Sequence, residues 1–134
     1  MMKTNNKQPL ITLITVVLND EHNIKKTIKS VINQSYKNIE YIVIDGKSKD
    51  RTLKTIKRFK KKISVIRSEK DKGIYDAFNK GLLLASGDLV GFVNSDDVLL
   101  PNALEILSKY YKENTEKDFF FGSVKKDWGI LHGY

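Results

Sequence analysis

Apolar and polar residues alternate along the chain in blocks that favour strands and helices in turn. Apolar runs rich in Ile, Val and aromatic residues predict strands at 10–18, 39–44, 63–66, 89–94 and 119–124. Between them, apolar residues recur every three to four positions and predict helices near 24–32, 53–59, 74–85 and 104–111. No repeat, low-complexity tract or flexible linker interrupts this order.

This alternation of strands and helices predicts an α/β fold. Right-handed crossovers then give a mainly parallel sheet with helices on both faces. The 134 residues suffice for one domain with a single core, so we expect residues 1–134 to form one unit. In such sheets, ligands bind beyond the carboxyl ends of the strands.

Polar clusters follow the first four predicted strands: "NDE", "DGKSKD", "SEKDKG" and "NSDD". Because parallel strands end at one edge of a sheet, we expect these clusters to share a rim and to form a site. A plainer interpretation remains open for each cluster taken alone. Asn, Ser and Asp are common in turns, and Ser48 and Asp50 could cap the helix that follows them.

Several classes of protein are disfavoured by the composition. The chain has no cysteine, so disulfides and thiolate zinc sites are excluded, and His22 and His132 lie too far apart in sequence for a metal-binding motif. The N-terminal run "PLITLITVVL" lacks a signal-cleavage pattern and is shorter than the roughly 20 residues that span a bilayer. We therefore interpret it as a buried strand of a cytoplasmic protein.

The net charge of +8 comes from one segment. Residues 47–72 contain 12 of the 24 Lys and Arg residues and only three acidic residues. Such a patch could attract nucleic acid, an anionic membrane face or phosphorylated small molecules, or it could be a solvated helix face. Nucleic acid is unlikely, because Phe59 is the only aromatic residue among these charges and base stacking needs more.

The rim clusters do not match the common nucleotide signatures. No G-x-G-x-x-G is present, and "GKS" at 46–48 is preceded by Tyr41 where a phosphate-binding loop has its first glycine. Carboxylates around phosphate-bearing ligands usually imply a divalent metal, since Mg²⁺ and Mn²⁺ prefer oxygen ligands. Asp96 could hold such a metal, and Asp45 could accept a hydrogen bond from a base N–H.

Four ordered motifs carry a resemblance to a known family: "TVVLND", "SVINQSYKNIEYIVIDGKSKDRT", "SEKDKGIYDAFNKG" and "ASGDLVGFVNSDD". Together they resemble glycosyltransferase family 2, whose members are nucleotide-sugar enzymes of the Rossmann-like GT-A fold. The resemblance covers nearly all of residues 10–124. It implies inverting transfer of a hexosyl or N-acetylhexosaminyl group to a saccharide or lipid-linked acceptor, with Mg²⁺ or Mn²⁺, in the synthesis of cell-surface polysaccharide.

The resemblance also implies roles for individual residues. Asp45 would contact the base, Ser95 would lie near the ribose, and Asp96 would coordinate the metal with Asp97 beside it. The positions that match the family's nucleotide-sugar site are Val16, Val17, Leu18, Asn19, Glu21, Asp45, Asp71, Lys72, Gly73, Asp76, Asn79, Asn94, Ser95 and Asp96.

The sequence departs from the family at several points. Asn94 replaces the first acid of the Asp-x-Asp motif, and Gly46 and Lys47 replace an acid and a glycine of many members. Family members continue past the fifth strand into an acceptor-binding half that supplies the general base. We therefore expect that half to be missing, with Asp127 as a weak candidate base.

Two further expectations follow from these features. An exposed sheet edge would favour a homo-oligomer, and the basic patch would allow peripheral association with the inner face of a membrane. Two alternative functions remain: a nucleotide-sugar-binding fragment without transfer activity, and, less favoured, a basic nucleic-acid-binding domain.

Overall fold

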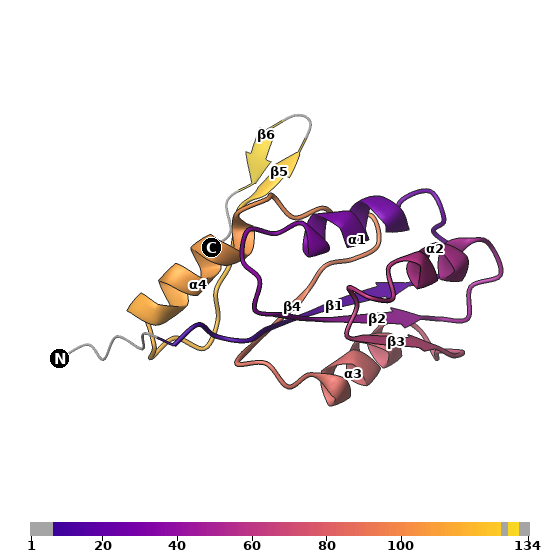
Figure 1. Cartoon of the computed structure of the whole chain (residues 1–134), viewed down its shortest axis with the longest axis horizontal. Coiled ribbons are helices and arrows are strands. Elements are labelled where there is room, and N and C mark those ends of the chain that lie inside the picture. Colours follow the sequence, from indigo (N-terminus) through magenta and orange to yellow (C-terminus); the bar gives the residue numbers. More distant parts are fainter. Residues whose placement is uncertain (1–6, 127–128, 132–134) are drawn as a thin grey trace.

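The computed structural model describes residues 7–126 and 129–131. Strands and helices alternate through most of the chain (Figure 1). In chain order the elements are β1 (Ile11–Val17), α1 (Ile24–Ile32), β2 (Ile39–Asp45), α2 (Thr52–Arg58), β3 (Val65–Ser68), α3 (Ile74–Leu84), β4 (Leu89–Phe92), α4 (Ala103–Glu113), β5 (Val124–Lys126) and β6 (Gly129–Leu131).

The main sheet has four parallel strands in the order β3-β2-β1-β4. Its central strand, β1, pairs with β2 along its whole length and with β4 along its first half. Every residue of β1 is buried, because the strand has neighbours on both sides and helices on both faces. This arrangement confirms the predicted α/β fold and mainly parallel sheet.

Helices cover the two faces of the sheet unequally. One face packs against α1, α2 and α4 through a large cluster that includes Ile28, Tyr41 and Leu104. The other face packs against α3 alone, and Figure 1 shows this helix on the opposite side of the sheet from α1 and α2. Gly81 permits a close approach there, since a Cβ at this position would lie 2.5 Å from Cγ2 of Ile14.

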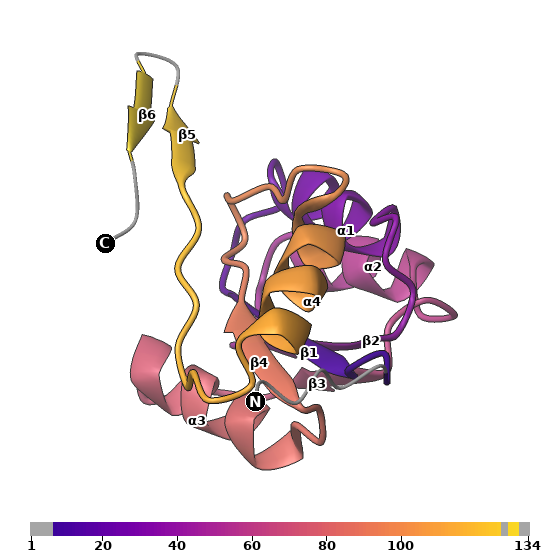
Figure 2. The same ribbon diagram turned by 90° about the vertical axis from the view of Figure 1, so that its left-hand side faces the viewer.

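Most predicted elements are present, with shifted ends. The third strand begins at Val65, two residues later than expected, and the fourth ends at Phe92 instead of residue 94. The prediction of a fifth sheet strand at 119–124 is wrong. Residues 119–123 adopt no regular structure, and β5 begins at Val124 and pairs only with β6, in an antiparallel hairpin outside the main sheet (Figure 2).

Strand propensity alone does not decide where a strand of the main sheet forms. The aromatic run that begins at Phe119 has strong strand propensity, but strand propensity depends on packing and on a neighbouring ladder. Phe120 packs against the ring of Tyr111, whereas Phe121 remains 73% exposed. The outer edge of β4 pairs with no described residue.

No helix within the described ranges is long and apolar enough to cross a membrane.

A buried hydroxyl pair joins the two longest strands and provides a test of the core. The side chains of Thr15 in β1 and Tyr41 in β2 share a hydrogen bond of 2.8 Å between their oxygens. We expect Tyr41→Phe to lower the free energy of unfolding by about 1–2 kcal/mol, because the Thr15 hydroxyl loses its partner.

The control is the double variant Tyr41→Phe with Thr15→Val, compared with both single variants by urea denaturation. The loss in the double variant should be smaller than the sum of the single losses. Simple additivity would contradict an energetic coupling between the two hydroxyls.

Candidate functional site

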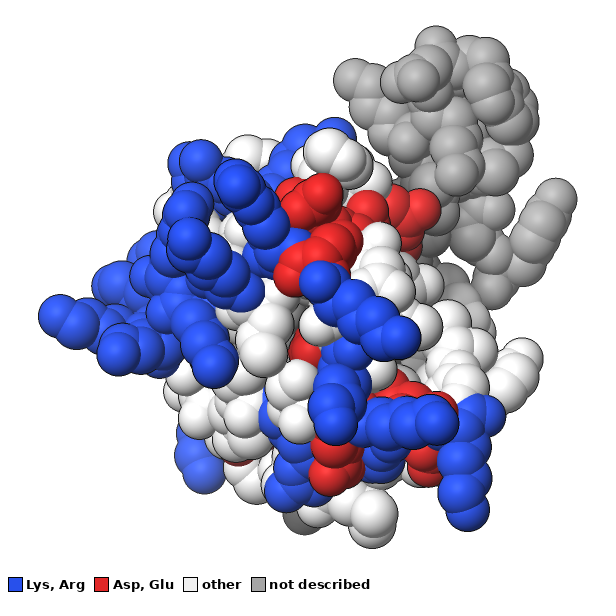
Figure 3. Space-filling model, turned by 90° about the vertical axis from the view of Figure 1, so that its right-hand side faces the viewer, with Lys and Arg blue, Asp and Glu red and all other residues white. Residues whose placement is uncertain are grey.

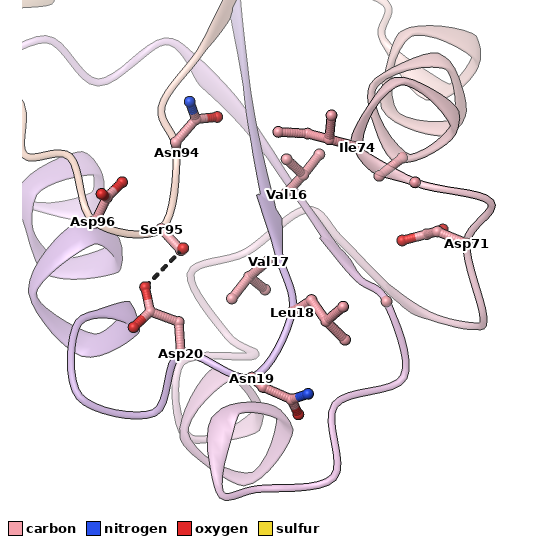
Figure 4. Close-up of a pocket in the computed structure, with 13 residues that line it drawn as sticks. Val16, Val17, Leu18, Asn19, Asp20, Asp71, Ile74, Asn94, Ser95 and Asp96 are labelled. Atoms are coloured by element: carbon pink, nitrogen blue, oxygen red, sulfur yellow. Dashed lines mark hydrogen bonds between the residues drawn. The ribbon is translucent and has the colours of Figure 1, made fainter.

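A cavity of about 460 Å³ opens at the carboxyl-terminal edge of the sheet. Figure 4 shows the end of β1 between the loop after β4 on one side and the start of α3 on the other. The lining residues are Val16, Val17, Leu18, Asn19, Asp20, Gly46, Asp71, Gly73, Ile74, Ala77, Asn94, Ser95 and Asp96. Three of the four predicted rim clusters, together with Gly46 from the remaining one, therefore meet at one cavity.

The turn after β1 is fixed by the loop after β2. Asn19 has a positive φ of 49°, which Asn tolerates better than most residues. Its backbone N–H donates to Ser48 Oγ (2.8 Å), and its Oδ1 accepts from the N–H of Lys49 (2.8 Å). These two hydrogen bonds hold Asn19 at the mouth of the cavity.

The loop after β4 is held by polar side chains of α1. The Oγ1 of Thr27 donates into a group of carbonyls that includes those of Ser95 (2.6 Å) and Asp97 (2.7 Å). One turn further along the helix, Ser30 Oγ accepts from Leu99 N–H at 3.1 Å. Thr27 is fully buried. The hydrogen bonds from Thr27 and Ser30 therefore fix the conformation of a loop that has no regular structure of its own.

Gln34 extends the same row to the start of α4. Its Nε2 donates to the carbonyl of Leu100 (2.7 Å), and its Oε1 accepts from the N–H of Leu104 (3.1 Å). Gln34 is fully buried and uses both ends of its amide. The "SVINQS" motif thus positions the loop that carries Asp96.

The loop after β4 brings two polar side chains, those of Asn94 and Ser95, to the cavity. Ser95 Oγ donates to Asp20 Oδ2 (2.8 Å), which joins the ends of β1 and β4 (Figure 4). Asn94 Oδ1 is buried and accepts no hydrogen bond from any described residue. A buried acceptor without a partner costs free energy, so a donor group of a ligand would be favoured at this position.

The structure gives Asp45 a different place from the expected one. Its carboxylate is 0% exposed and accepts hydrogen bonds from Ser48 N–H (3.1 Å), Ser48 Oγ and Ser68 Oγ (2.6 Å). It therefore ties the loop after β2 to the end of β3 and does not line the cavity. Gly46 lines it instead, and a Cβ at Gly46 would lie 2.9 Å from Asp71 Oδ2.

On the α3 side, Lys80 organises the loop after β3. Its Nζ lies 2.7 Å from Asp71 Oδ1, 3.3 Å from Glu69 and 3.4 Å from Asp76, and it donates to the Lys70 carbonyl at 3.1 Å. The hydrogen bond to Asp71 and the other carboxylates raise the pKa of Lys80 above its usual value. A fixed cation therefore holds Asp71 at the cavity.

Asp76 closes the same loop from its other end. The Lys72 N–H donates to Asp76 Oδ2 (2.9 Å), and this bond together with Lys80 lowers the pKa of the Asp76 carboxyl. Because that pKa is lowered on folding, the stabilisation is present above the unfolded carboxyl pKa and is lost only as the pH falls through the folded value. The loop should therefore keep this conformation at neutral pH.

The polar residues of the lining provide oxygen ligands, and the charged ones among them are acidic. Asp20, Asp71 and Asp96 contribute carboxylates, whereas no Lys or Arg of the described residues lines the cavity. No group of three or more potential metal-ligating residues occurs among the residues that the structure describes. This donor set fits Mg²⁺ or Mn²⁺, which typically take one or two carboxylates and complete their shell with phosphate oxygens and water.

The predicted site residues divide into two groups by their position. Those that line the cavity are Val16, Val17, Leu18, Asn19, Asp71, Gly73, Asn94, Ser95 and Asp96. Those that do not line it are Glu21, Asp45, Lys72, Asp76 and Asn79, and Asp97 also lies outside the lining. Glu21 Oε2 accepts from the Arg51 N–H (3.0 Å), and Asn79 is exposed on α3. Asp127 falls outside the described residues.

Four lining residues escaped the sequence-based prediction: Asp20, Gly46, Ile74 and Ala77. Asp20 lies within the polar cluster after β1, and Gly46 follows the end of β2, so strand-end position alone could have indicated both. Ile74 and Ala77 belong to the apolar face of α3, where nothing in the sequence separates cavity wall from core.

Solved structures of other proteins share this fold. The domain superimposes on *S. aureus* TarS 1-349 in complex with UDP-GlcNAc with a TM-score of 0.74 at 24% identity, over 78% of this chain and 32% of that one. The mannosyltransferase PcManGT from *Pyrobaculum calidifontis*, in complex with GDP-Man and Mn²⁺, gives a TM-score of 0.71 at 23% identity, over 90% and 37%. The class is thus the GT-A fold, with its cavity at the strand ends.

The family follows from the sequence comparison. Residues 12–133 match the model of Glycosyl transferase family 2, so the chain belongs to that family. A relative from *Escherichia coli*, UDP-Glc:alpha-D-GlcNAc-diphosphoundecaprenol beta-1,3-glucosyltransferase WfgD, is 35% identical over 118 residues, which cover 87% of this chain and 46% of WfgD. The chain spans less than half the length of the curated relatives that it matches first.

The position of Asp45 leads to a prediction about stability. We expect Asp45→Ala to lower the free energy of unfolding by about 2 kcal/mol, because three hydrogen bonds to a buried carboxylate are lost. Asp96→Ala serves as the matched control and should stay within about 0.5 kcal/mol of the wild type, since an exposed rim carboxylate supports no packing. Both values come from urea denaturation, and equal stabilities for the two variants would argue against a structural role for Asp45.

Proposed function

We propose that this domain binds a nucleoside-diphosphate sugar in the strand-end cavity and that the protein containing it transfers the sugar to an acceptor hydroxyl. The observation that carries the proposal is the cavity itself, which combines an apolar wall, an unpartnered buried acceptor and three carboxylates at the carboxyl ends of parallel strands. Membership of glycosyltransferase family 2 supports it.

In this proposal, the nucleoside lies along the end of β1. Val16, Val17 and Leu18 offer an apolar wall for a base, and Asn94 Oδ1 would accept a hydrogen bond from a ribose hydroxyl or base N–H. The bound UDP-GlcNAc of TarS and the bound GDP-Man of PcManGT support a nucleotide sugar as the ligand class. The structure of Asp45 makes a stabilising role more consistent than base contact for that residue.

The diphosphate would lie near Asp96. A carboxylate-lined cavity repels a diphosphate unless a cation accompanies it, since like charges in a partly enclosed site destabilise binding. Asp96 would hold the divalent metal, with Asp97 next to it and Asp20 across the Ser95 hydrogen bond. When bound, the metal would neutralise the charge that develops on the departing diphosphate.

The transfer itself would be a direct displacement. The acceptor oxygen forms a bond to the anomeric carbon while the bond from that carbon to the diphosphate oxygen breaks, and the electron pair leaves with the nucleoside diphosphate. Inversion at the anomeric carbon follows from this single step. The proton of the acceptor hydroxyl passes to a general base, which must lie within hydrogen-bond reach of it.

The proposal extends to the acceptor and the cellular setting. In the name of WfgD, UDP-Glc supports a hexosyl donor and GlcNAc-diphosphoundecaprenol supports a lipid-linked saccharide as acceptor. We propose that this transfer serves cell-surface polysaccharide synthesis at the cytoplasmic side of a membrane. A thermal-shift screen of nucleoside-diphosphate sugars with and without Mn²⁺ or Mg²⁺ tests the donor site. Stabilisation that requires both sugar nucleotide and metal is expected, and no shift with any donor would overturn the proposal.

Asp96 provides the sharper test of the metal site. We expect Asp96→Ala to remove the Mn²⁺-dependent part of nucleoside-diphosphate binding, a loss of about tenfold or more in affinity, because without the metal the diphosphate meets the remaining carboxylates uncompensated. Isothermal titration with and without Mn²⁺ measures the effect.

Glu116→Ala is the matched control, since Glu116 is an exposed acid outside the cavity lining. This variant should bind as the wild type does. Mn²⁺-dependent binding that survives Asp96→Ala would refute the assignment of Asp96 as the metal ligand.

A further inference from the structure

A strongly basic surface lies beside the cavity, and its side chains do not line the cavity. We call it the basic face and define it by its nine exposed side chains: Lys47, Lys49, Arg51, Lys54, Lys57, Arg58, Lys60, Lys61 and Lys62. No acidic residue occurs between Arg51 and Arg67. Within the part of the chain that the structure describes, none of the nine side chains forms an ion pair.

The basic face is a protruding ridge. Figure 3 looks onto the edge toward which the arrowheads of β1 and β2 point in Figure 1, and Lys and Arg side chains project there as one continuous group over α2 and the loop that follows it. Unpaired like charges repel one another and favour an external polyanion. A convex shape fits an extended, gently curved anionic surface better than a small ligand that needs enclosure.

The side chains on this surface are unsuited to reading nucleic-acid bases. Residues 47–72 contain no Asn or Gln, and their only aromatic residue, Phe59, packs against the core cluster of the α1 side. Base-edge recognition relies on bidentate amides as well as Arg, and single-strand binding relies on exposed aromatic rings. Seven of the nine cations are Lys, which acts as a point charge without the planar geometry of Arg.

The basic face is continuous with the rim of the cavity. Lys47 directly follows Gly46, a lining residue, and Lys70 and Lys72 flank Asp71 in the loop after β3. Adsorption through the basic face, with Lys70 and Lys72 beside it, would therefore bring the mouth of the cavity close to the anionic surface. That placement suits an acceptor whose saccharide is attached to a lipid in the membrane.

We propose that the basic face adsorbs this protein to an anionic lipid bilayer, with the cavity mouth near the lipid headgroups. The choice of a bilayer over other polyanions rests on the proposed function, because only a lipid-linked acceptor requires the membrane. The adsorption itself depends on the unpaired charges and on no group of the donor site. Clusters of Lys and Arg of this size bind phosphatidylserine-like and phosphatidylglycerol-like surfaces through their summed potential.

Vesicle sedimentation tests this inference with the full chain and without any nucleotide. The chain should bind vesicles of phosphatidylcholine mixed with phosphatidylglycerol and should not bind phosphatidylcholine alone. Binding should weaken steeply when the salt is raised from about 0.1 M to about 0.5 M, because the Debye length falls from about 10 Å to less than half of that.

Two triple variants of equal net charge separate the basic face from overall charge. The variant with Lys57→Gln, Lys60→Gln and Lys61→Gln should lose at least about twentyfold in vesicle affinity, since each cation near the surface strengthens binding roughly fivefold. The control with Lys109→Gln, Lys112→Gln and Lys117→Gln changes α4 and the residues just after it, at the other end of the molecule from α2 (Figure 1). It should lose less than about threefold, because charges beyond a Debye length from the surface are screened.

Three outcomes would overturn the inference: no binding to anionic vesicles, equal losses in the two triple variants, or displacement of the chain from vesicles by duplex DNA at the same phosphate concentration. The last result would assign the basic face to nucleic acid. Failure of donor binding in the thermal-shift screen would leave the vesicle result untouched, so the two proposals can fail separately.

Discussion

The position of Asp96 depends on a row of hydrogen bonds from the buried side of α1 and the residues that follow it. The loop after β4 has no strand partner of its own, and its backbone groups must find partners elsewhere. Thr27 and Ser30 of α1 and Gln34, two residues past its end, provide them at helical spacing, and Thr27 and Gln34 are buried. An apolar residue at any of these positions would leave buried carbonyl or N–H groups unpaired. Polar residues inside this helix therefore serve the site, although they look like defects in its apolar face.

Charge is distributed over the molecule in two complementary ways. Carboxylates point into the cavity, where Lys80 compensates Asp71 from outside the lining and leaves Asp96 without a cationic partner. Cations of the basic face remain unpaired on the adjoining surface. In the proposed function, a site with this polarity would take up a diphosphate together with a metal, while the basic face would attract anions without one.

The sequence was sufficient to predict the fold and most of the rim. Continuous apolar runs locate all four parallel strands, and apolar residues at helical spacing locate all four helices, because burial selects these patterns. The fifth strand failed because strand propensity cannot reveal whether a segment pairs with a free sheet edge. The position of Asp45 could not be predicted for a related reason: a carboxylate at a strand end looks the same in sequence whether it faces a ligand or two serines, and its contact with a base stays a prediction. Only the positions of Ser48 and Ser68 in space distinguish these cases.

The central claim is that the strand ends of this domain form one nucleotide-diphosphate site whose loop is preset by α1. Amide chemical-shift mapping by NMR, with UDP and then GDP added in the presence of Mg²⁺, tests it most directly. The account predicts perturbed signals at residues 18–20, Gly46, Gly73 and residues 94–96 for at least one of the two nucleotides, with residues 57–62 unchanged. Perturbation confined to residues 57–62, or none with either nucleotide, would contradict it.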